Sequence, residues 1–465
     1  MKYYTTIGLE VHAELKTKSK MFCSCLNDPN EKKPNINICP ICLAHPGTLP
    51  VANKEAIKSV IKVGLALNSK IANFTEFDRK NYFYPDIPKG YQISQYKYPI
   101  VEGGKLNGVK ITRVHLEEDT GTSKHDRGNF SLIDFNRAGV PLMELVTEPV
   151  IHSAKQAGDF GRELQLLLKY LDVSNANMEK GEMRVELNIS ISADPKKLGT
   201  KVEVKNLNSF KAVEKAAEFE IKRMTALLKE SNGDKIVQET RGWNEFKQKT
   251  FSQRKKENSH DYRYFPDPDI PKFYLDELFN IKEIKLPELP AQKRERYKKE
   301  YGIKDEDIES YILDFELGEY FEKVANSLDK EEVKTASNYI TSDYLGLKKN
   351  SPKIELPAFN HFVELIKMVK RGEISSRTAK DILALIVVED NSPKIIAAEK
   401  GLLQDSDEES VKKIVQKIIK ENPKVVEIYK KGKENAVMSL VGQVMKETKG
   451  SANPKIVLKL LKELL

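Results

Sequence analysis

An alternating stretch, Ile7-Gly8-Leu9-Glu10-Val11-His12-Ala13-Glu14-Leu15, lies near the start of the chain. A period of two between apolar and polar residues is typical of a β-strand with one buried face. Glu10, His12 and Glu14 fall together on the opposite face. The stretch therefore predicts a strand that places two carboxylates and an imidazole on one side of a sheet.

Two later stretches repeat this alternation. Residues 183–192 place Glu186 on a polar face, and residues 201–205 place Glu203 and Lys205 opposite two valines. Ordinary solvated strand faces also carry Lys, Thr and Glu, so one such face need not be functional. Several faces weighted toward carboxylates, histidine, asparagine and arginine instead favour one polar cavity floored by a sheet.

Two amphipathic segments are expected to back this sheet as helices. Their apolar residues recur with the 3.6-residue period of a helix, and we interpret them as core rather than as ligands. They are Phe160, Leu164, Leu167, Leu168 and Leu171 in the first, and Phe210, Val213, Ala217, Ile221, Met224 and Leu228 in the second.

The composition indicates a multidomain chain with a strongly charged surface. Its 465 residues are too many for one compact core. The net charge of +8, from 77 basic and 69 acidic residues, does not by itself indicate a nucleic-acid binder. The longest apolar run, residues 382–388, is far shorter than the roughly 20 residues of a membrane span. No secretory signal is visible at the N-terminus, so we expect a cytoplasmic protein.

The sequence changes character after a proline-rich linker at Pro287 and Pro290. Before it, strand patterns alternate with helical segments. After it, the pattern is almost wholly helical and dense in Lys and Glu. The acidic stretch 405–409 interrupts this pattern, and a last helical segment extends from about residue 408 to the end.

The four cysteines lie in two close pairs, Cys23 with Cys25 and Cys39 with Cys42. Two such pairs separated by a loop can place four thiolates around one zinc ion, and disulfides are disfavoured in a reducing cytosol. Four sulfur ligands leave no open position, so this zinc would be structural. Inert thiols are the alternative.

Acidic clusters come from three distant segments: Glu10 with His12, residues 115–119, and Glu144 shortly after residues 134–139. Carboxylates brought together repel one another unless a cation neutralises them. Magnesium prefers oxygen ligands, and a histidine would also admit manganese. Scattered surface salt bridges are the other interpretation of these residues.

Several familiar catalytic motifs are missing from the sequence. We find no G-x-x-x-x-G-K-[ST] loop, no kinase motif set and no G-x-S-x-G elbow. Basic and aromatic residues do interleave in stretches 79–86 and 259–267. Such stretches suit stacking on nucleotide or single-stranded RNA bases, and equally suit tyrosine-rich loops packed against the sheet.

Over essentially its whole length the chain resembles the family of B subunits of the bacterial tRNA-dependent amidotransferases. Besides the four cysteines, the stretches that carry this resemblance are Ile7-Gly8-Leu9-Glu10-Val11-His12, residues 132–149 around Asp134-Phe135-Asn136-Arg137-Ala138-Gly139, Glu203-Val204-Lys205-Asn206-Leu207-Asn208-Ser209-Phe210, His260-Asp261-Tyr262-Arg263-Tyr264-Phe265-Pro266, and Leu440-Val441-Gly442-Gln443-Val444-Met445-Lys446.

The resemblance implies an α+β fold class with three parts. A cradle-shaped catalytic domain, an antiparallel sheet with helices similar to the glutamine synthetase and guanido kinase fold, would occupy residues 1–292 and include a zinc knuckle at 23–42. An all-α helical domain would follow at 293–407. A YqeY-like helical tail at 408–465 would bind tRNA through lysines, for which a solvated helix surface is the alternative: Lys430, Lys431, Lys433 and Lys446.

The resemblance also implies a reaction and partners. ATP would phosphorylate the side-chain carboxylate of Glu-tRNA(Gln) or Asp-tRNA(Asn), and ammonia would displace the phosphate to leave an amide. The A subunit would release the ammonia from glutamine into an internal channel, and the small C subunit would complete a heterotrimer. The implied cofactors are ATP, Mg²⁺ and structural Zn²⁺.

In the family, the magnesium ligands match four residues of this chain: Glu10, His12, Glu118 and Glu144. The alternation of the strand disagrees at one of them, because it puts Glu117 and not Glu118 on the polar face. A strand that ends at Leu116 would release Glu118, so we expect Glu118 as the ligand and keep Glu117 as the alternative.

Three cations are expected to contact phosphate groups: Arg137, Lys205 and Arg254. The chain departs from the family at Thr122, where many relatives have lysine, and at Glu186, where they have aspartate. The first departure would shift a nucleotide contact, for which Lys124 is the candidate. Within the family, the archaeal E subunit carries a large insertion for which 465 residues leave no room. The alternative of another class is a non-catalytic zinc-knuckle adaptor that only presents tRNA.

Overall fold

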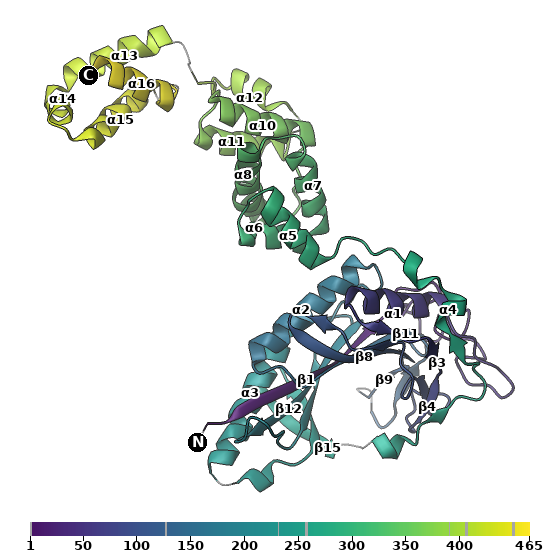
Figure 1. The fold of residues 1–465 in the computed structure, drawn as a ribbon. Coiled ribbons are helices and arrows are strands. Elements are labelled where there is room, and N and C mark those ends of the chain that lie inside the picture. Colours follow the sequence, from purple (N-terminus) through teal and green to yellow (C-terminus); the bar gives the residue numbers. More distant parts are fainter. Residues whose placement is uncertain are drawn as a thin grey trace. The chain divides into compact units, whose positions relative to one another are not determined.

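The computed structural model describes residues 2–125, 128–230, 232–255, 259–389, 391–404, 408–448 and 452–465. Residues 405–407, at the expected end of the helical domain, lie outside this description. The chain divides into two compact units, Met1–Pro290 and Ala291–Leu465. The first contains a large sheet with helices, and the named elements of the second are helices (Figure 1). The mixed α+β organisation expected from the sequence is confirmed.

The large sheet of the first unit has β1 (Tyr4–Glu14) near its middle, paired antiparallel with a strand on each side. The alternating stretches at 7–15, 183–192 and 201–205 are confirmed as the strands β1, β12 and β13. In spatial order the sheet consists of β15 (Lys249–Lys255), β14 (Glu239–Asn244), β13 (Val202–Leu207), β12 (Met183–Ser192), β1, β11 (Pro141–Thr147), β8 (Val109–Glu118), β6 (Val101–Glu102) and β2 (Lys70–Ile71), with β7 (Lys105–Leu106) paired to β8.

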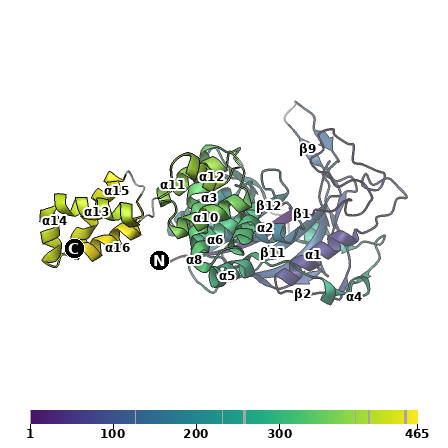
Figure 2. The ribbon, with the colours of Figure 1, turned by 90° about the horizontal axis from the view of Figure 1, so that it is seen from above.

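Three helices cover one face of this sheet: α1 (Lys54–Ala66), α2 (Ala154–Tyr170) and α3 (Phe210–Lys229) (Figures 1 and 2). The Ser153 and Ser209 side chains cap α2 and α3 by accepting hydrogen bonds from backbone N–H groups of the first turn. On β1, Leu9 and Val11 are buried in the core beneath the helices, and full burial of each such side chain contributes about 1.5–3 kcal/mol. Because side chains alternate along a strand, this burial turns the polar residues of β1 to the other face.

Smaller elements border that polar face. A second sheet consists of β16 (Phe265–Pro266), β4 (Asp78–Asn81) and β5 (Tyr91–Ser94), and β5 lies against β8. A hairpin of β9 (Thr122–Lys124) and β10 (Leu132–Asp134) projects from the unit (Figure 2). The strands β3 (Phe74–Thr75) and β17 (Phe273–Tyr274) form another pair, followed by the short helix α4 (Leu275–Leu278). Phe265 pairs with Arg79, so the two basic and aromatic stretches lie side by side.

The second unit is built from amphipathic helices. Its main elements are α5 (Pro290–Glu300), α6 (Asp305–Leu313), α7 (Phe315–Ala325), α8 (Lys330–Asn338), α9 (Leu345–Asn350), α10 (Phe359–Arg371), α11 (Ser376–Ile386), α12 (Pro393–Glu399), α13 (Glu408–Glu421), α14 (Pro423–Lys430), α15 (Val437–Glu447) and α16 (Pro454–Leu464). The last helices share a core of their own around Val415, Leu440 and Leu461.

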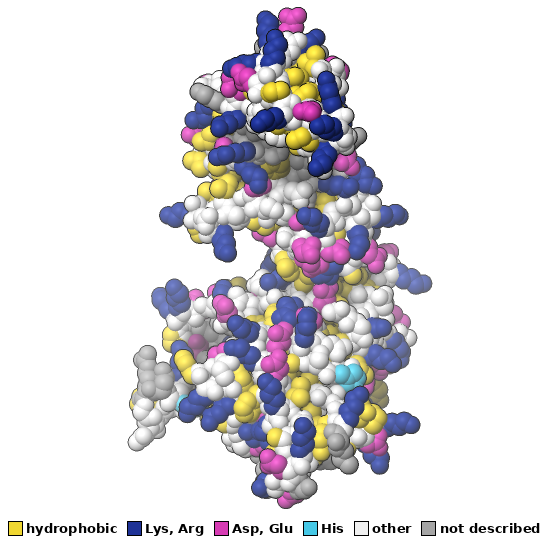
Figure 3. All heavy atoms as spheres, turned by 90° about the vertical axis from the view of Figure 1, so that its left-hand side faces the viewer, with side chains coloured by type: hydrophobic (Ala, Val, Ile, Leu, Met, Phe, Trp, Pro, Cys, Tyr) yellow, Lys and Arg dark blue, Asp and Glu magenta, His cyan; other side chains and the backbone are white. Residues whose placement is uncertain are grey.

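Charged side chains are spread over the surface. On the face drawn in Figure 3, Lys and Arg lie at many separate places with Asp and Glu among them. This dispersal agrees with the small net charge of +8. Within the described part of the chain, no helix combines the length and the apolar character that crossing a membrane requires.

Candidate active site

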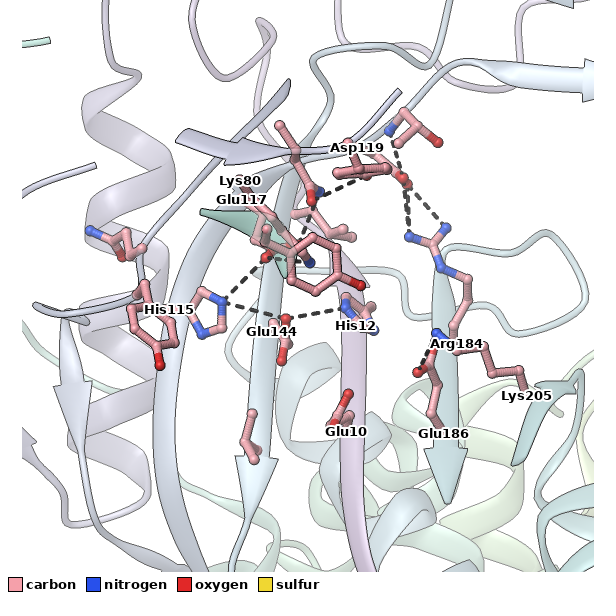
Figure 4. A pocket seen from close by; sticks show the side chains of 18 of the residues that line it. Glu10, His12, Lys80, His115, Glu117, Asp119, Glu144, Arg184, Glu186 and Lys205 are labelled. Atoms are coloured by element: carbon pink, nitrogen blue, oxygen red, sulfur yellow. Dashed lines mark hydrogen bonds and ion pairs between the residues drawn. The ribbon is translucent and has the colours of Figure 1, made fainter. Parts of the chain in front are cut away.

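A cavity of about 670 Å³ lies over the polar face of the sheet. Its floor carries side chains of β13, β12, β1, β11 and β8, and residues of β4 and the 262–264 segment also line it (Figure 4). The polar cavity floored by a sheet that the sequence predicts is therefore present. Its volume is in the range of pockets that bind small molecules and cofactors.

One cluster in the cavity joins three neighbouring strands. His12 on β1 pairs with Glu144 on β11, and Glu144 pairs in turn with His115 on β8. His12 Nε2 lies 3.3 Å from Glu144 Oε2, and His115 Nε2 lies 3.4 Å from the same oxygen and 3.4 Å from Glu117 Oε1. Ligand atoms of His12, Glu117 and Glu144 all lie within 4.8 Å of one another. Residues from three distant segments thus converge on one point.

The electrostatics of this cluster are those of a cation site. Burial would raise the pKa of Glu144, but His115 and His12 hold it well below its ordinary value. Burial would likewise lower the pKa of His12, yet Glu144 and other carboxylates raise it to about 9. Among the described residues, Nδ1 of both imidazoles is buried without a hydrogen-bond partner. The raised pKa values of both imidazoles reflect the negative charge of the surrounding carboxylates, and a divalent cation with oxygen and nitrogen ligands fits the same place.

Glu118 does not join this cluster. β8 continues to Glu118, so the expectation that the strand ends at Leu116 is wrong, and Glu118 points to the opposite face from Glu117. The Glu118 carboxylate accepts hydrogen bonds from Lys89 Nζ at 2.8 Å and from the backbone N–H of Ile93 at 2.9 Å. The structure therefore brings together His12, Glu144 and the alternative residue Glu117.

A second acidic cluster lies on the β12 side of β1. Carboxylate oxygens of Glu10, Glu186 and Glu203 lie within 4.8 Å of one another, since Glu10 pairs with Glu186 and β13 brings in Glu203. Lys205 Nζ is 2.9 Å from Glu186 and 4.0 Å from Glu203. Burial would lower the pKa of Lys205, but these carboxylates raise it. The sequence placed Glu203 on a polar strand face without identifying it as a ligand, because the alternation there covers only a few residues.

Asp119 organises the cations on another side of the cavity. Arg184 Nη1 and Nη2 donate to its carboxylate at 3.0 and 3.1 Å, and Arg137 Nε is 3.7 Å away. Arg137 also donates to the backbone oxygens of Thr120 and Gly121, each at 3.1 Å. Burial would raise the pKa of Asp119, but the two arginines lower it to about 2. The sequence analysis counted Asp119 in the acidic cluster 115–119 but did not predict its pairing with Arg184, 65 residues away.

This shifted pKa predicts how stability depends on pH. Because the folded pKa of Asp119 lies below the ordinary value of 3.8, its contribution of about 2 kcal/mol is complete above pH 4 and is lost as the pH falls to 2. We expect Asp119→Asn to destabilise the protein clearly at pH 6 and progressively less toward pH 2. Urea titration followed by fluorescence of Trp243, the single tryptophan, measures this in the first unit.

The matched control for this prediction is Asp172→Asn. Asp172 is 78% exposed and pairs with Lys16 at 2.7 Å, and exposed pairs contribute little at any pH. A loss of stability in Asp119→Asn that is the same at every pH would contradict the prediction.

Lys80 on β4 lies next to the first cluster, with Nζ 3.9 Å from Glu117 Oε1. Burial would lower the pKa of Lys80, but Glu117 and the other groups around it hold that pKa well above its ordinary value. Sequence reasoning did not single out Lys80, although it noted the basic and aromatic stretch that contains it. Arg254 lies on β15 opposite Thr240, and its side chain is outside the described part of the structure.

The four cysteines form a separate cluster. Their sulfur atoms lie within 4.8 Å of one another, and Cys39 Sγ is 3.9 Å from Cys42 Sγ. Four sulfurs bound to one zinc ion at ~2.3 Å lie ~3.8 Å apart, so the cluster has the size of such a site. A hydrogen bond from Cys23 lowers the pKa of Cys42 to about 5, while burial raises the pKa of Cys25 to about 11. The predicted clustering of the cysteines is confirmed.

Two protein families match the chain. The family described as the GatB/GatE catalytic domain matches residues 5–280, and the one described as the GatB domain matches residues 319–465. Three relatives are named as the B subunit of aspartyl/glutamyl-tRNA(Asn/Gln) amidotransferase. They come from Caldanaerobacter subterraneus subsp. tengcongensis (47% identical), Thermoanaerobacter pseudethanolicus (45%) and Thermotoga maritima (43%). Each alignment covers 100% of this chain and 99% of the relative. Both acidic clusters and the cysteine cluster lie within residues 5–280.

Proposed function

Because the chain belongs to the family of aspartyl/glutamyl-tRNA(Asn/Gln) amidotransferase B subunits, we propose that it activates and amidates the side-chain carboxylate of Glu-tRNA(Gln), Asp-tRNA(Asn) or both. The observation that carries the proposal is the convergence of His12, Glu117 and Glu144 in one cavity within the matched catalytic region. A carboxylate is a poor acyl donor, so the reaction needs ATP and a site that neutralises charge.

The proposed reaction has two steps. An oxygen of the acceptor carboxylate attacks the γ-phosphorus of ATP, so that a new O–P bond forms while the bond to ADP breaks. Ammonia then attacks the acyl carbon of the resulting acyl phosphate. The C–O bond breaks, phosphate leaves with one proton of the ammonia, and an amide remains on the tRNA.

In this proposal Mg²⁺ would be held by His12, Glu117 and Glu144, with Glu10 as part of the adjacent acidic cluster. Glu117 takes the place that the family pattern suggests for Glu118, because Glu117 shares the polar face. Magnesium bound there would screen charge between the nucleotide and the attacking carboxylate. The oxygen-rich donor sets and the Nε2 atoms of His12 and His115, which face Glu144, support this assignment.

The nucleotide phosphates are assigned to Arg137, Lys205 and Arg254. Lys205 supports this assignment through its position beside the second acidic cluster, since it could exchange Glu186 for a phosphate oxygen. Glu186 retains the charge of the family's aspartate on a longer stem. Lys124 on β9 remains the candidate for the contact that Thr122 cannot make.

The same proposal covers the architecture and the partners. Residues 1–292 would form a cradle domain of the glutamine synthetase and guanido kinase type, followed by a helical domain at 293–407 and a tRNA-binding tail at 408–465. Zn²⁺ would hold the knuckle at 23–42 in shape. The A subunit would supply ammonia through a channel, the C subunit would complete a heterotrimer, and the complex would act in the cytoplasm.

Replacing Glu10 with alanine tests whether the chain is catalytic. Glu10 accepts a hydrogen bond from Asn188 at 2.8 Å and lies in the second acidic cluster, so its loss should lower the rate of ATP-dependent amidation by roughly 100-fold. Binding of tRNA should change by less than about twofold, since phosphate contacts are made by cations and hydrogen-bond donors and not by carboxylates. The reconstituted amidotransferase is assayed for Gln-tRNA or Asn-tRNA formation and for tRNA binding.

Glu102→Ala is the matched control, because Glu102 is 49% exposed and pairs with Lys70 away from the cavity. If the chain were a tRNA adaptor without catalytic function, Glu10→Ala would leave the amidation rate unchanged. Turnover in Glu10→Ala equal to that of the control would overturn the catalytic assignment.

A further inference from the structure

The cations that line the cavity differ in how their hydrogen-bond donors are used. Arg184 is bound to Asp119, and Lys205 is bound to Glu186. Lys80 is different: in the described parts of the chain, its Nζ has an ion-pair contact at 3.9 Å with Glu117 and no acceptor at hydrogen-bond distance. An ammonium group has three N–H donors, so Lys80 retains unused binding capacity inside a catalytic cavity.

Aromatic rings enclose this ammonium group. Nζ lies 5.1 Å from the ring centroid of Tyr262 and 6.0 Å from that of Tyr82, and these two rings meet edge to face. The Lys80 side chain is only 20% exposed. Tyrosine faces stabilise a cation without consuming its donors, and they keep bulk water away. An anion that enters this corner therefore meets a partly desolvated, charged donor, where a hydrogen bond is stronger than in water.

The position of Lys80 suggests which anion it receives. The sheet order β13-β12-β1-β11-β8 puts Lys205 at one end of the cavity floor. Lys80 comes from the second sheet and stands next to Glu117 of β8 at the other end (Figure 4). In phosphoryl transfer the attacking and leaving oxygens lie on opposite sides of the phosphorus, roughly in line. With the nucleotide phosphates at Lys205, the acceptor reaches the phosphorus from the Lys80 side.

We propose that Lys80 is a further catalytic residue, which binds the acceptor carboxylate of the aminoacyl group on tRNA through its free N–H donors and orients it toward the γ-phosphorus. The inference rests on the proposed function and adds the subsite for the acceptor. It also accounts for the paired basic and aromatic stretches: Lys80 and Tyr82 come from the first, and Tyr262 comes from the second. The tyrosines enclose the ammonium, and Lys80 contacts the substrate.

Arg113 is the nearest competitor for this role. It lines the same cavity from the same face of β8, and its buried Nε has no hydrogen-bond partner among the described residues. Arg113 lies four residues before Glu117, which is ~13 Å along a strand. Lys80 differs in that its Nζ lies 3.9 Å from Glu117 of the proposed metal site, whereas no ion pair joins Arg113 to Glu117 within the described residues. An experiment can separate the two cations.

The test measures discrimination between a carboxylate and its neutral isostere in binding, without turnover. The probes are tRNA molecules that carry glutamate or glutamine at the 3′ end through a stable amide link. The complete amidotransferase, with Mg²⁺ and a non-hydrolysable ATP analogue, should bind the glutamyl form about 10- to 100-fold more tightly. Lys80→Met should remove this preference, and Lys80→Arg should retain part of it. A preference that survives in Lys80→Met overturns the proposal.

Three controls make the outcome specific. Lys97→Met removes an exposed lysine outside the cavity, whose Nζ lies 5.1 Å from the ring centroid of Tyr98. This variant should keep the preference for the glutamyl form. Thermal melting of Lys80→Met should show a folded protein at the assay temperature, although the loss of the ion pair with the buried Glu117 lowers its stability below that of this control. Affinity for the ATP analogue alone should be unchanged in Lys80→Met, and a tenfold loss there with the preference intact would assign Lys80 to the nucleotide instead.

Arg113→Met completes the comparison. If this variant loses the preference while Lys80→Met retains it, the acceptor subsite belongs to Arg113 and our proposal is wrong. Failure of the proposed function has a different signature, because the unmodified complex would then not amidate Glu-tRNA(Gln) or Asp-tRNA(Asn) at all. A wild-type complex that is active, with Lys80→Met indistinguishable from it in binding, refutes only the role of Lys80.

Discussion

Replacing Glu144 with glutamine is expected to lower the amidation rate by about a thousandfold or more, because it removes the central anionic ligand of the proposed metal site. Glu144 on β11 lies between β1 and β8, and its Oε2 is 3.3 Å from His12 Nε2 and 3.4 Å from His115 Nε2. Glutamine keeps the shape of the side chain and one oxygen. It cannot supply the charge that a magnesium ion requires.

The fold should survive this substitution. Burial disfavours the charged form of His12 and His115, and the Glu144 carboxylate is a major reason that the pKa of each is raised. Without that carboxylate the two imidazoles can lose their protons, so no unpaired charge remains buried. Glu144→Gln should therefore be an inactive and folded protein. A loss of activity caused by unfolding would have a different physical origin.

The measurements follow from this distinction. Amidation is assayed at increasing Mg²⁺ concentration, and direct binding of Mn²⁺ reports the metal site without turnover. The matched control is Glu148→Gln, just after the same strand, where the carboxylate accepts a hydrogen bond from Thr112 at 2.8 Å on the exposed side. If Glu144→Gln retained more than about a tenth of the rate, with unchanged metal dependence, the magnesium assignment would be wrong.

The sequence was most informative where one rule acts over many residues. Alternation along 7–15 and 183–192 correctly separated the buried face of each strand from its polar face. The polar face carries Glu10 and His12 on β1 and Glu186 on β12. The same rule pointed to Glu117, and only an assumed early end of the strand favoured Glu118. The spacing of the cysteines likewise predicted their cluster. Within each pair the two thiols are close in sequence, so only the approach of one pair to the other depends on the fold.

Contacts between distant segments could not be predicted in this way. Lys80 reaches Glu117 from a different sheet, and Asp119 meets Arg184 across 65 residues. Lys80 and Asp119 do not lie on long periodic segments, so no local pattern in the sequence indicates which partner each of them contacts. The stacking of Tyr96 on Tyr264, with ring centroids 4.4 Å apart, is equally invisible in the sequence. Such contacts depend on which distant strands pair and how the two sheets pack, which local propensity does not determine.

Replacing Cys42 with serine is expected to release zinc and to destabilise the first unit by about 3 kcal/mol or more, since structural zinc sites contribute directly to folding. Cys42 is 5% exposed, and its Sγ accepts a hydrogen bond from the backbone N–H of Cys39 at 3.2 Å. Lys20, which is fully buried, lies with Nζ 3.9 Å from the same sulfur. A zinc ion with four thiolates carries a net negative charge, which this lysine would offset.

Metal analysis of the untreated protein should give one zinc per chain, with all four thiols protected from alkylation until a chelator is added. Cys42→Ser should contain no zinc and should unfold at lower temperature, as reported by Trp243 fluorescence. Ser24→Ala, an exposed substitution between Cys23 and Cys25, is the matched control and should leave the zinc content and the unfolding temperature unchanged. Two or fewer protected thiols, or equal stability of the two variants, would identify the cysteines as inert.

Zinc loss should also affect the cavity, because the segment that leads into the knuckle is hydrogen-bonded to the loop that carries Arg137. Lys20 Nζ donates a hydrogen bond to the backbone oxygen of Phe135 at 3.2 Å. The backbone N–H of Met21 donates to the backbone oxygen of Gly139 at 2.7 Å. Arg137 lies between these two anchors and lines the cavity. In Cys42→Ser the amidation rate should therefore fall even at temperatures where the first unit remains folded, whereas Ser24→Ala should retain full activity. Unchanged activity in a zinc-free, folded protein would show that the knuckle stabilises the fold without positioning Arg137.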